Sequence, residues 1–364
     1  MKIQLFDTSI KNSEYVVKDV RDLLDSGKYI LGKNVREFEK KLSKFLSSKF
    51  VIGVNSGTDA LTLSLVGLGI RPGDYVITSC FTYFATVEAV KHAGGIPYIV
   101  DVDKNSLQMN FDGIDEAILK KAKFIIPVHL FGGKVDLEKL IKTSKKFNLK
   151  IVEDVAQSFG TNFENGSFTG TIGDAGAFSF YPTKTLGSVG DAGAISTNNK
   201  SLYEDLLKLR NHGHIDRDNF AFPGYNSRLD EIQAIYLNRK LETINEDILK
   251  RKEIASMYFE RLEHIKDLNF YNEHIDTFNY FPISTVNPKN RNGLIEHLNN
   301  HGVETAVYYK KTLADLNFKW IYGASEFKNA DYIKKRILCL PIYPKLEQKS
   351  VEYVVKKIKE FYHA

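Results

Sequence analysis

The stretch FVIGVNSGTDALTLSLVGLGIRPGDYVITS, residues 50–79, sets the pattern of the fold. It holds two short, almost wholly apolar runs, at 50–54 and 75–78, on either side of a helical segment predicted over 58–68. Apolar strands that are separated by helical crossovers are typical of a parallel sheet covered by helices on both faces. The stretch therefore predicts an α/β fold.

The same alternation extends outward from this stretch. Further helices are predicted over 14–28, 34–47, 84–93 and 136–146, and further strands at 96–100, 124–128, 151–153, 176–181 and 192–197. Apolar residues at 3.6-residue spacing predict one long helix over 228–263, and β-like runs follow at 279–285 and 305–309. We expect a mostly parallel sheet in a large domain, residues 1–245, and a smaller α+β domain, residues 246–364.

Composition narrows the class of protein. The 364 residues are 43% hydrophobic, and 50 Lys and Arg against 45 Asp and Glu give a net charge of +5 without a clustered basic stripe. Such a surface does not favour a nucleic-acid partner. Cys80 and Cys339 lie far apart in the sequence, which favours a reducing compartment. Neither a secretory leader nor an apolar run long enough for a bilayer is present, so we expect a cytoplasmic protein without a membrane partner.

Several common cofactor motifs are missing from the sequence. No G-x-G-x-x-G lies between a strand and a helix, and no G-x-x-x-x-G-K-[ST] occurs. The Cys and His spacings do not match a zinc site, and there is no G-x-S-x-G elbow. Nicotinamide, P-loop, metal and serine-hydrolase chemistry are all disfavoured.

Three other segments carry residue types suited to one cofactor. The first is NSGTDA at 55–60, between a strand and a helix. The free N–H groups of a helix N-terminus favour a phosphate, and a glycine there lets the backbone approach it closely. The alternative is a plain helix cap made by Ser56 or Thr58.

The second segment is IVEDVAQ at 151–157, where carboxylates follow an apolar strand. The carboxyl ends of strands line the ligand crevice of an open α/β sheet, and a carboxylate there could hold a ring nitrogen protonated. A helix cap or a surface ion pair is the alternative.

The third segment is GAFSFYPTK at 176–184, followed by Gly187, Gly190 and Gly193. Its lysine leaves an apolar strand, and desolvation would lower the pKa of this amine and free it to bond an aldehyde. Most lysines are solvated surface residues, which is the alternative. A phosphate cup, an acid for a pyridinium nitrogen and a lysine for an aldehyde are together the groups that pyridoxal 5'-phosphate (PLP) requires.

On these residues the chain resembles the DegT/DnrJ/StrS family of nucleotide-sugar aminotransferases, which has the aspartate-aminotransferase fold (fold type I). The resemblance covers nearly the whole chain. It runs through SGKYILG (26–32), NSGTDAL (55–61), PVHLFG (127–132), EDVAQ (153–157), FSFYPTK (178–184), GYNSRLD (224–230) and LPIYP (340–344).

The resemblance implies a role for each matching residue. Lys184 would bond the aldehyde of PLP and Asp154 would pair with the pyridine nitrogen. The other implied contacts are Gln157 near the phenolic oxygen of PLP, Gly57, Thr58 and Ser179 at its phosphate, Tyr83 stacked on its ring, and Asn226 reaching in from the partner subunit of a homodimer. Residue type alone favours another interpretation of Tyr83, as an ordinary aromatic side chain of the core.

Other polar residues near these motifs are left in less specific roles. His129, His212 and His214 are expected to be polar packing or supporting groups, because Lys184 can move the protons itself. Arg228 is either a salt-bridge partner or a substrate anchor.

The residue before Pro182 carries information on the substrate. Tyr181, with the loop Gly190-Asp191-Ala192-Gly193, is similar to family members that aminate C3 of the sugar. The sequence departs from the pattern of this family at two positions. Ala192 stands where glycine is usual, and Lys310 follows Tyr308-Tyr309 where a His-Tyr-Pro run is frequent.

The implied reaction passes the amino group of L-glutamate to a dTDP-linked 3-keto-6-deoxyhexose. Its product would be a dTDP-3-amino-3,6-dideoxyhexose for surface glycan or lipopolysaccharide biosynthesis. A UDP-2-acetamido-3-keto-uronic acid and a 4-keto sugar are alternative substrates. Lys184 disfavours a sugar dehydratase of the same fold, in which histidine replaces this lysine. A catalytically silent regulatory protein with the PLP fold is the alternative from another class.

Overall fold

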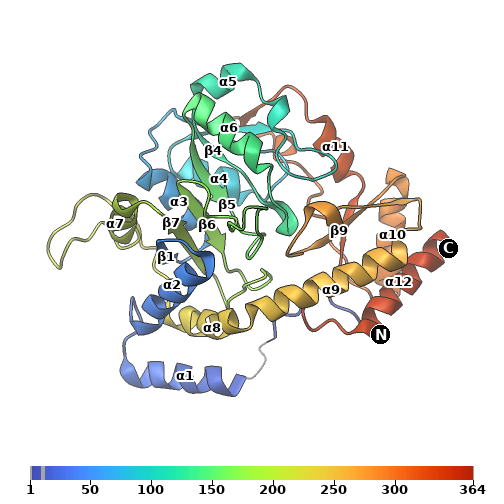
Figure 1. Ribbon diagram of the computed structural model, residues 1–364, viewed down its shortest axis with the longest axis horizontal. Coiled ribbons are helices and arrows are strands. Elements are labelled where there is room, and N and C mark those ends of the chain that lie inside the picture. Colours follow the sequence, from blue (N-terminus) through green and yellow to red (C-terminus); the bar gives the residue numbers. More distant parts are fainter. Residues whose placement is uncertain (1, 10–12, 364) are drawn as a thin grey trace.

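The computed structural model describes residues 2–9 and 13–363 and contains two β-sheets. The larger has eight strands in the order β1-β7-β6-β5-β4-β2-β3-β10, and the smaller has three in the order β11-β9-β8. Helices lie on both faces of the large sheet, whereas the small sheet lies beside the C-terminal helices (Figure 1). The predicted α/β class is confirmed.

The strands of the large sheet are short and mostly buried. They are β1 (Phe50–Val54), β2 (Tyr75–Ser79), β3 (Ile96–Val100), β4 (Ala122–Ile126), β5 (Lys150–Asp154), β6 (Ala175–Ser179), β7 (Gly193–Thr197) and β10 (Tyr322–Gly323). All pairs from β6 across to β10 are parallel, and β7 alone runs antiparallel to both of its neighbours, β6 and β1. The sheet is therefore mostly parallel, as the apolar strands predicted.

The helices around this sheet are α1 (Ser13–Ser26), α2 (Lys33–Leu46), α3 (Gly57–Gly67), α4 (Ala85–His92), α5 (Glu116–Lys121), α6 (Leu137–Phe147), α7 (Lys200–Leu209) and α8 (Glu231–Glu242). Helix α2 buries Val35, Phe38, Leu42 and Leu46, which recur at helical spacing. Helix α3 is buried over residues 60–65 and packs against β6 and β7. Its N-terminus is thereby held against the carboxyl end of the central strands.

The remaining elements are α9 (Ile244–Leu262), β8 (Leu268–Phe270), β9 (Phe281–Thr285), α10 (Pro288–Asn300), α11 (Lys328–Lys334), β11 (Ile337–Leu340) and α12 (Gln348–Tyr362). Their core is built around side chains such as Tyr258 and Phe281, and it continues into Phe81 and Phe131, which follow β2 and β4 in the chain. Strand β10 crosses back to pair with β3. The domain division at 245/246 stays a prediction. None of the helices in the described residues combines the length and the apolar character that crossing a membrane requires.

Two expectations from the sequence were wrong. The single helix over 228–263 is two helices, because the chain leaves helical geometry at Thr243 (φ −110°, ψ 5°). The β-like run at 305–309 is not a strand: only Ala306 makes a bridge, with Cys339. Tyr308 and Tyr309 turn toward Tyr280 instead, and this turn takes the backbone out of the register that a strand would need.

Candidate active site

The N-terminus of α3 and the end of β6 meet at the carboxyl edge of the large sheet. A Cβ atom on Gly57 would lie 2.6 Å from the Cβ of Ser179, so only glycine allows this approach. The Ser56 hydroxyl accepts the N–H of Asp59 at 3.1 Å and caps the helix. The N–H groups of Gly57 and Thr58 belong to the first helical turn, which has no partner of its own for them. They stand beside the Ser179 hydroxyl as donors for an anion.

Asp154 ends β5 and is 5% exposed. Its Oδ2 atom accepts the hydroxyl of Thr86 at 2.9 Å, and its Oδ1 atom accepts the N–H of Ala156 at 3.1 Å. Burial raises the pKa of Asp154, while these two hydrogen bonds and the charge of Lys184 act in the opposite direction. The carboxylate is thus held among donors and faces a cation.

Lys184 follows β6 in a tight turn, in which its N–H donates to the carbonyl of Tyr181 at 2.8 Å. Its Nζ atom lies 6.0 Å from the centre of the Tyr280 ring. Burial lowers the pKa of Lys184 to about 8, and the Asp154 carboxylate only partly opposes this. Roughly a tenth of this amine is therefore neutral at pH 7, far more than for an ordinary lysine, and this neutral form is the one that nucleophilic or general-base chemistry requires.

Gln157 bridges two parts of the site. Its Oε1 atom accepts the N–H of Phe131 at 3.0 Å, and its Nε2 atom donates to the hydroxyl of Tyr309 at 2.9 Å. Burial raises the pKa of Tyr309, so its phenol stays protonated. Among the described residues, the second proton on Gln157 Nε2 has no acceptor, so it is available to a bound group.

A buried hydrogen-bond network lies behind Asp154. His129 and Glu153 are fully buried, and His129 Nε2 lies 3.0 Å from Glu153 Oε2. Because His129 Nδ1 accepts the N–H of Val135 at 3.3 Å, the ring proton is on Nε2 and points at the carboxylate. Glu153 also accepts three backbone N–H groups from residues 170–173 at 2.8–2.9 Å. This satisfied network is consistent with the packing role expected for His129.

The loop between α7 and α8 carries Asn226 and extends away from the body of the molecule (Figure 1). Asn226 is exposed, and its Oδ1 atom accepts Nη2 of Arg228. Nη1 of Arg228 donates to Asn211 at 3.0 Å, so within the described chain this guanidinium is held by amides and not by a carboxylate. Tyr83, three residues before Thr86, is 63% exposed.

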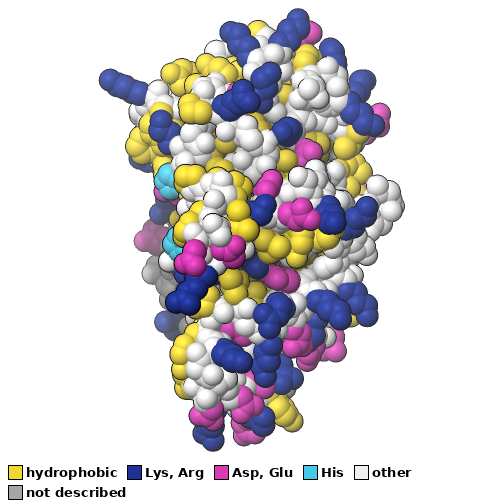
Figure 2. All heavy atoms as spheres, turned by 90° about the vertical axis from the view of Figure 1, so that its left-hand side faces the viewer, with side chains coloured by type: hydrophobic (Ala, Val, Ile, Leu, Met, Phe, Trp, Pro, Cys, Tyr) yellow, Lys and Arg dark blue, Asp and Glu magenta, His cyan; other side chains and the backbone are white. Residues whose placement is uncertain are grey.

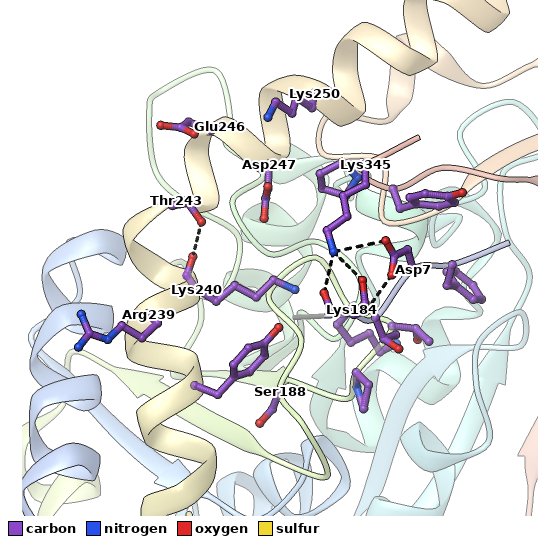
Figure 3. A pocket seen from close by; sticks show the side chains of 18 of the residues that line it. Asp7, Lys184, Ser188, Arg239, Lys240, Thr243, Glu246, Asp247, Lys250 and Lys345 are labelled. Carbon is purple, nitrogen blue, oxygen red and sulfur yellow. Dashed lines mark hydrogen bonds and ion pairs between the residues drawn. The ribbon is translucent and has the colours of Figure 1, made fainter. Parts of the chain in front are cut away.

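A cavity of about 480 Å³ opens beside Lys184. It lies between the N-terminal segment, the α8–α9 junction and residues 343–345, and Figure 3 shows its side chains. Six cationic side chains and four carboxylates line it: Lys184, Arg239, Lys240, Lys250, Arg251 and Lys345, with Asp7, Glu242, Glu246 and Asp247.

These cations are not equivalent. Lys345 Nζ is bonded to Ser9 at 2.6 Å and to Asp7 at 3.5 Å. Lys240 extends into the cavity (Figure 3), and it has no carboxylate within ion-pair distance among the described residues. Burial, and then the charge of Arg251, lower the pKa of Lys240 to about 8. Lys240 is therefore a cation with an unmet need for an anion.

Sequence reasoning did not single out Thr86, Tyr309 or Lys240. Thr86 lies three residues after Tyr83, and this closeness in the sequence is the only signal that could have pointed to it. Tyr309 and Lys240 reach the site from distant segments, so their placement depends on tertiary structure.

Comparison with known proteins gives consistent matches over the whole chain. Residues 11–359 match the model of the DegT/DnrJ/EryC1/StrS aminotransferase family. The chain is 34% identical to a "Pleiotropic regulatory protein" of Geobacillus stearothermophilus, covering 100% of this chain and 99% of the relative. It is 35% identical to the dTDP-3-amino-3,6-dideoxy-alpha-D-galactopyranose transaminase of Aneurinibacillus thermoaerophilus, covering 99% and 98% of the two chains. It is 33% identical to the UDP-2-acetamido-2-deoxy-3-oxo-D-glucuronate aminotransferase of Pseudomonas aeruginosa, covering 95% and 97%.

Solved structures agree with these relatives. A DegT DnrJ EryC1 StrS aminotransferase from Brucella abortus superposes with a TM-score of 0.94 at 32% identity, covering 100% of both chains. NtdA from Bacillus subtilis, solved with bound cofactor PMP, gives a TM-score of 0.92 at 28% identity, covering 100% of this chain and 86% of that one.

Proposed function

Because the chain belongs to the DegT/DnrJ/EryC1/StrS aminotransferase family, we propose that it transfers the amino group of L-glutamate to C3 of a nucleotide-linked sugar. It is a PLP-dependent nucleotide-sugar aminotransferase. The proposed acceptor is a dTDP-linked 3-keto-6-deoxyhexose, and the proposed product is a dTDP-3-amino-3,6-dideoxyhexose for surface glycan synthesis. The observation that carries the proposal is the Lys184 amine, with a pKa of about 8, facing the buried carboxylate of Asp154.

The residues at this edge of the sheet fit PLP. The N–H groups of Gly57 and Thr58, with the Ser179 hydroxyl, form an anion cradle that a Cβ on Gly57 would close. Asp154 supplies the negative charge that a protonated ring nitrogen needs. Gln157 has one free amide proton for the phenolic oxygen. We therefore assign these residues, with Lys184 and the ring of Tyr83, to the cofactor.

Each residue then has a defined task. When bound, PLP supplies an aldehyde that takes up the amino group and a ring that withdraws electrons. Asp154 keeps its charge through its bonds to Thr86 and Ala156, and so it holds a proton on the ring nitrogen. Lys184 takes the proton that leaves Cα of glutamate, and in the second half of the reaction it gives a proton to C3 of the sugar.

The cavity beside Lys184 is the proposed site of the nucleotide diphosphate. Its unpaired cation, Lys240, and the more exposed Lys250 are assigned to the diphosphate, because charge-assisted bonds to phosphate are strong. The six cationic side chains of the cavity outnumber its four carboxylates, and the resulting net positive charge suits a substrate with two negative charges.

We also propose a homodimer in which Asn226 completes the partner's site. Asn226 stands on an extended loop, oriented by Arg228. The same loop exposes Ile215 and Phe220, with 62% and 57% of their surface open to solvent. Figure 2 faces the side of the molecule with α7 and this loop, and shows apolar side chains scattered among Lys, Arg, Asp and Glu. A partner that covers this loop would bury the exposed apolar surface.

The alternatives differ in what they predict. A UDP-2-acetamido-3-keto-uronic acid is supported by the name of the Pseudomonas aeruginosa relative, and a 4-keto sugar keeps the same chemistry. A regulatory role without catalysis is suggested by the name of the Geobacillus stearothermophilus relative. The domain division at 245/246 and a cytoplasmic location remain proposals.

One assay separates these alternatives. Nucleotide 3-keto and 4-keto sugars, with dTDP or UDP, are each supplied with L-glutamate, and 2-oxoglutarate release is measured. We expect the dTDP-linked 3-keto-6-deoxyhexose to be the fastest acceptor. Preference for a UDP-linked uronic acid would replace the substrate but keep the chemistry. No release of 2-oxoglutarate with any acceptor would favour the regulatory alternative.

A further inference from the structure

A cluster of metal-ligating side chains lies far from the active site, where α10 and α12 pack together. It consists of His297 and His301, four residues apart at the end of α10, and Glu360 near the end of α12. One ligand atom from each side chain lies within 4.8 Å of the other two. Figure 1 places these two helices beside the C-terminus, on the opposite side of the molecule from α7.

The hydrogen bonds of His301 leave one of its ring nitrogens free to bind a metal ion. His301 Nδ1 lies 2.8 Å from the carbonyl oxygen of His297, which can only accept, so the ring proton is on Nδ1 and the lone pair on Nε2 is open. A backbone carbonyl that fixes the tautomer in this way is the usual support of a metal-bound histidine. The hydroxyl of Tyr353 donates to the His301 carbonyl at 3.2 Å and fixes the backbone at this position.

His297 has an unmet bonding need. Its Nε2 atom is out of contact with solvent and has no hydrogen-bond partner among the described residues. Its ring packs against His301 and Phe361, with ring centres 4.5 Å and 5.7 Å apart. Leaving such a buried polar atom without a hydrogen-bond partner is unfavourable. A metal ion seated among the three side chains would supply the missing partner.

The electrostatics of the cluster has two sides. The last turns of α10 and α12 both end here, and the C-terminus of a helix carries partial negative charge that favours a cation. Against this, Lys357 lies 2.7 Å and Lys356 4.0 Å from the Glu360 carboxylate. Lys357 therefore competes with a metal for Glu360.

We infer that His297, His301 and Glu360 form a site for a divalent transition metal, with Zn²⁺ the best match, which joins α10 to α12. Two imidazoles and one carboxylate are a regular zinc donor set, completed by water. Ligand atoms around a tetrahedral zinc ion lie about 3.3 Å apart, given bonds of about 2.0–2.1 Å. The ligand atoms of the three side chains, now within 4.8 Å of one another, must therefore move closer together when the ion binds, and the ion pair between Glu360 and Lys357 must break.

The test is calorimetric titration of the holoenzyme with ZnCl₂ at pH 7.5, together with thermal unfolding with and without the metal. We expect one Zn²⁺ per chain, a higher Tm with zinc, and affinity at least tenfold lower in His301→Gln and Glu360→Gln. Lys357→Gln should bind more tightly because Glu360 is freed. His264→Gln, an exposed histidine outside the cluster, is the matched control and should bind as the wild type does.

Acidification should weaken binding, since both imidazoles must be neutral to bind metal. Zinc affinity that is the same in wild type, His301→Gln and Glu360→Gln would overturn the proposal, as would loss of binding in His264→Gln. The Tm of each variant without zinc separates lost binding from lost folding. The three side chains are at most partly buried, so these variants should fold.

Discussion

Replacing Thr86 with valine tests how the protein keeps Asp154 charged. Thr86 is 1% exposed and donates its hydroxyl to Asp154 Oδ2 at 2.9 Å. Its oxygen also lies 3.1 Å from that of Thr82. Valine has nearly the same shape, so the change removes one donor to the carboxylate and leaves the packing of α4 in place. Thr86→Ser keeps the hydroxyl and is the matched control.

The size of the effect follows from the strength of that bond. A hydrogen bond to a charged group contributes about 1.5–3 kcal/mol, and about 1.36 kcal/mol corresponds to one pKa unit. Thr86→Val should therefore raise the pKa of Asp154 further, on top of the rise that burial already causes. More of the carboxyl is then neutral at pH 7, and its hold on the ring proton weakens. We expect the half-reaction with glutamate to slow by about 10–100-fold.

The sign of the pH dependence is fixed by the same argument. A carboxyl with a raised pKa regains its charge as pH increases, so the deficit of Thr86→Val should shrink between pH 7 and 9. Stopped-flow loss of the visible cofactor band after adding glutamate measures this rate. The reasoning fails if Thr86→Val stays within twofold of the wild type at every pH, or if Thr86→Ser is impaired as severely.

Three further outcomes follow from the structure. The rate at which apoenzyme regains its visible band with PLP should rise with pH and level off above about 8, because only the neutral Lys184 amine attacks; a rate that keeps rising steeply above pH 9 would contradict the lowered pKa. Glu153→Ala should lower the free energy of unfolding in urea by at least about 1–3 kcal/mol, the cost of one buried donor left unpaired, because it leaves three backbone N–H groups and the His129 Nε2–H group without their acceptor. The exposed Glu253→Ala should have almost no effect, and equal losses would refute this. Lys240→Met should raise KM for the nucleotide sugar about tenfold or more. Lys250→Met should raise this KM less, and in Lys240→Met the KM for glutamate should rise less than the KM for the sugar. An unchanged KM for the sugar in Lys240→Met would remove Lys240 from the diphosphate site.

The strand–helix alternation could be predicted from the sequence because central strands need apolar residues on both faces. It located strands such as β1 and β3 with the bounds that the structure has. The antiparallel direction of β7 could not be predicted, because the apolar pattern of a buried strand does not depend on the direction in which the strand runs. The break at Thr243 lacks a Gly or Pro that would have marked it, and so the two helices α8 and α9 read as one.

The site was predictable where its residues adjoin a strand end or a helix start. Gly57, Asp154 and Lys184 belong to this class, and their roles remain predictions until variants are measured. Thr86 and Tyr309 act through side-chain bonds across 68 and 152 residues of sequence, and no local pattern contains that information.

The sharpest test of the account is a single spectroscopic experiment on the purified holoenzyme. L-glutamate should convert its visible band to a near-UV band, and a dTDP-linked 3-keto-6-deoxyhexose added afterwards should restore the visible band. Lys184→Ala should bind PLP but show neither change. A wild-type band that glutamate leaves unaltered, or a Lys184→Ala protein that cycles at the wild-type rate, would contradict the claim that Lys184 carries the protons of a sugar transamination.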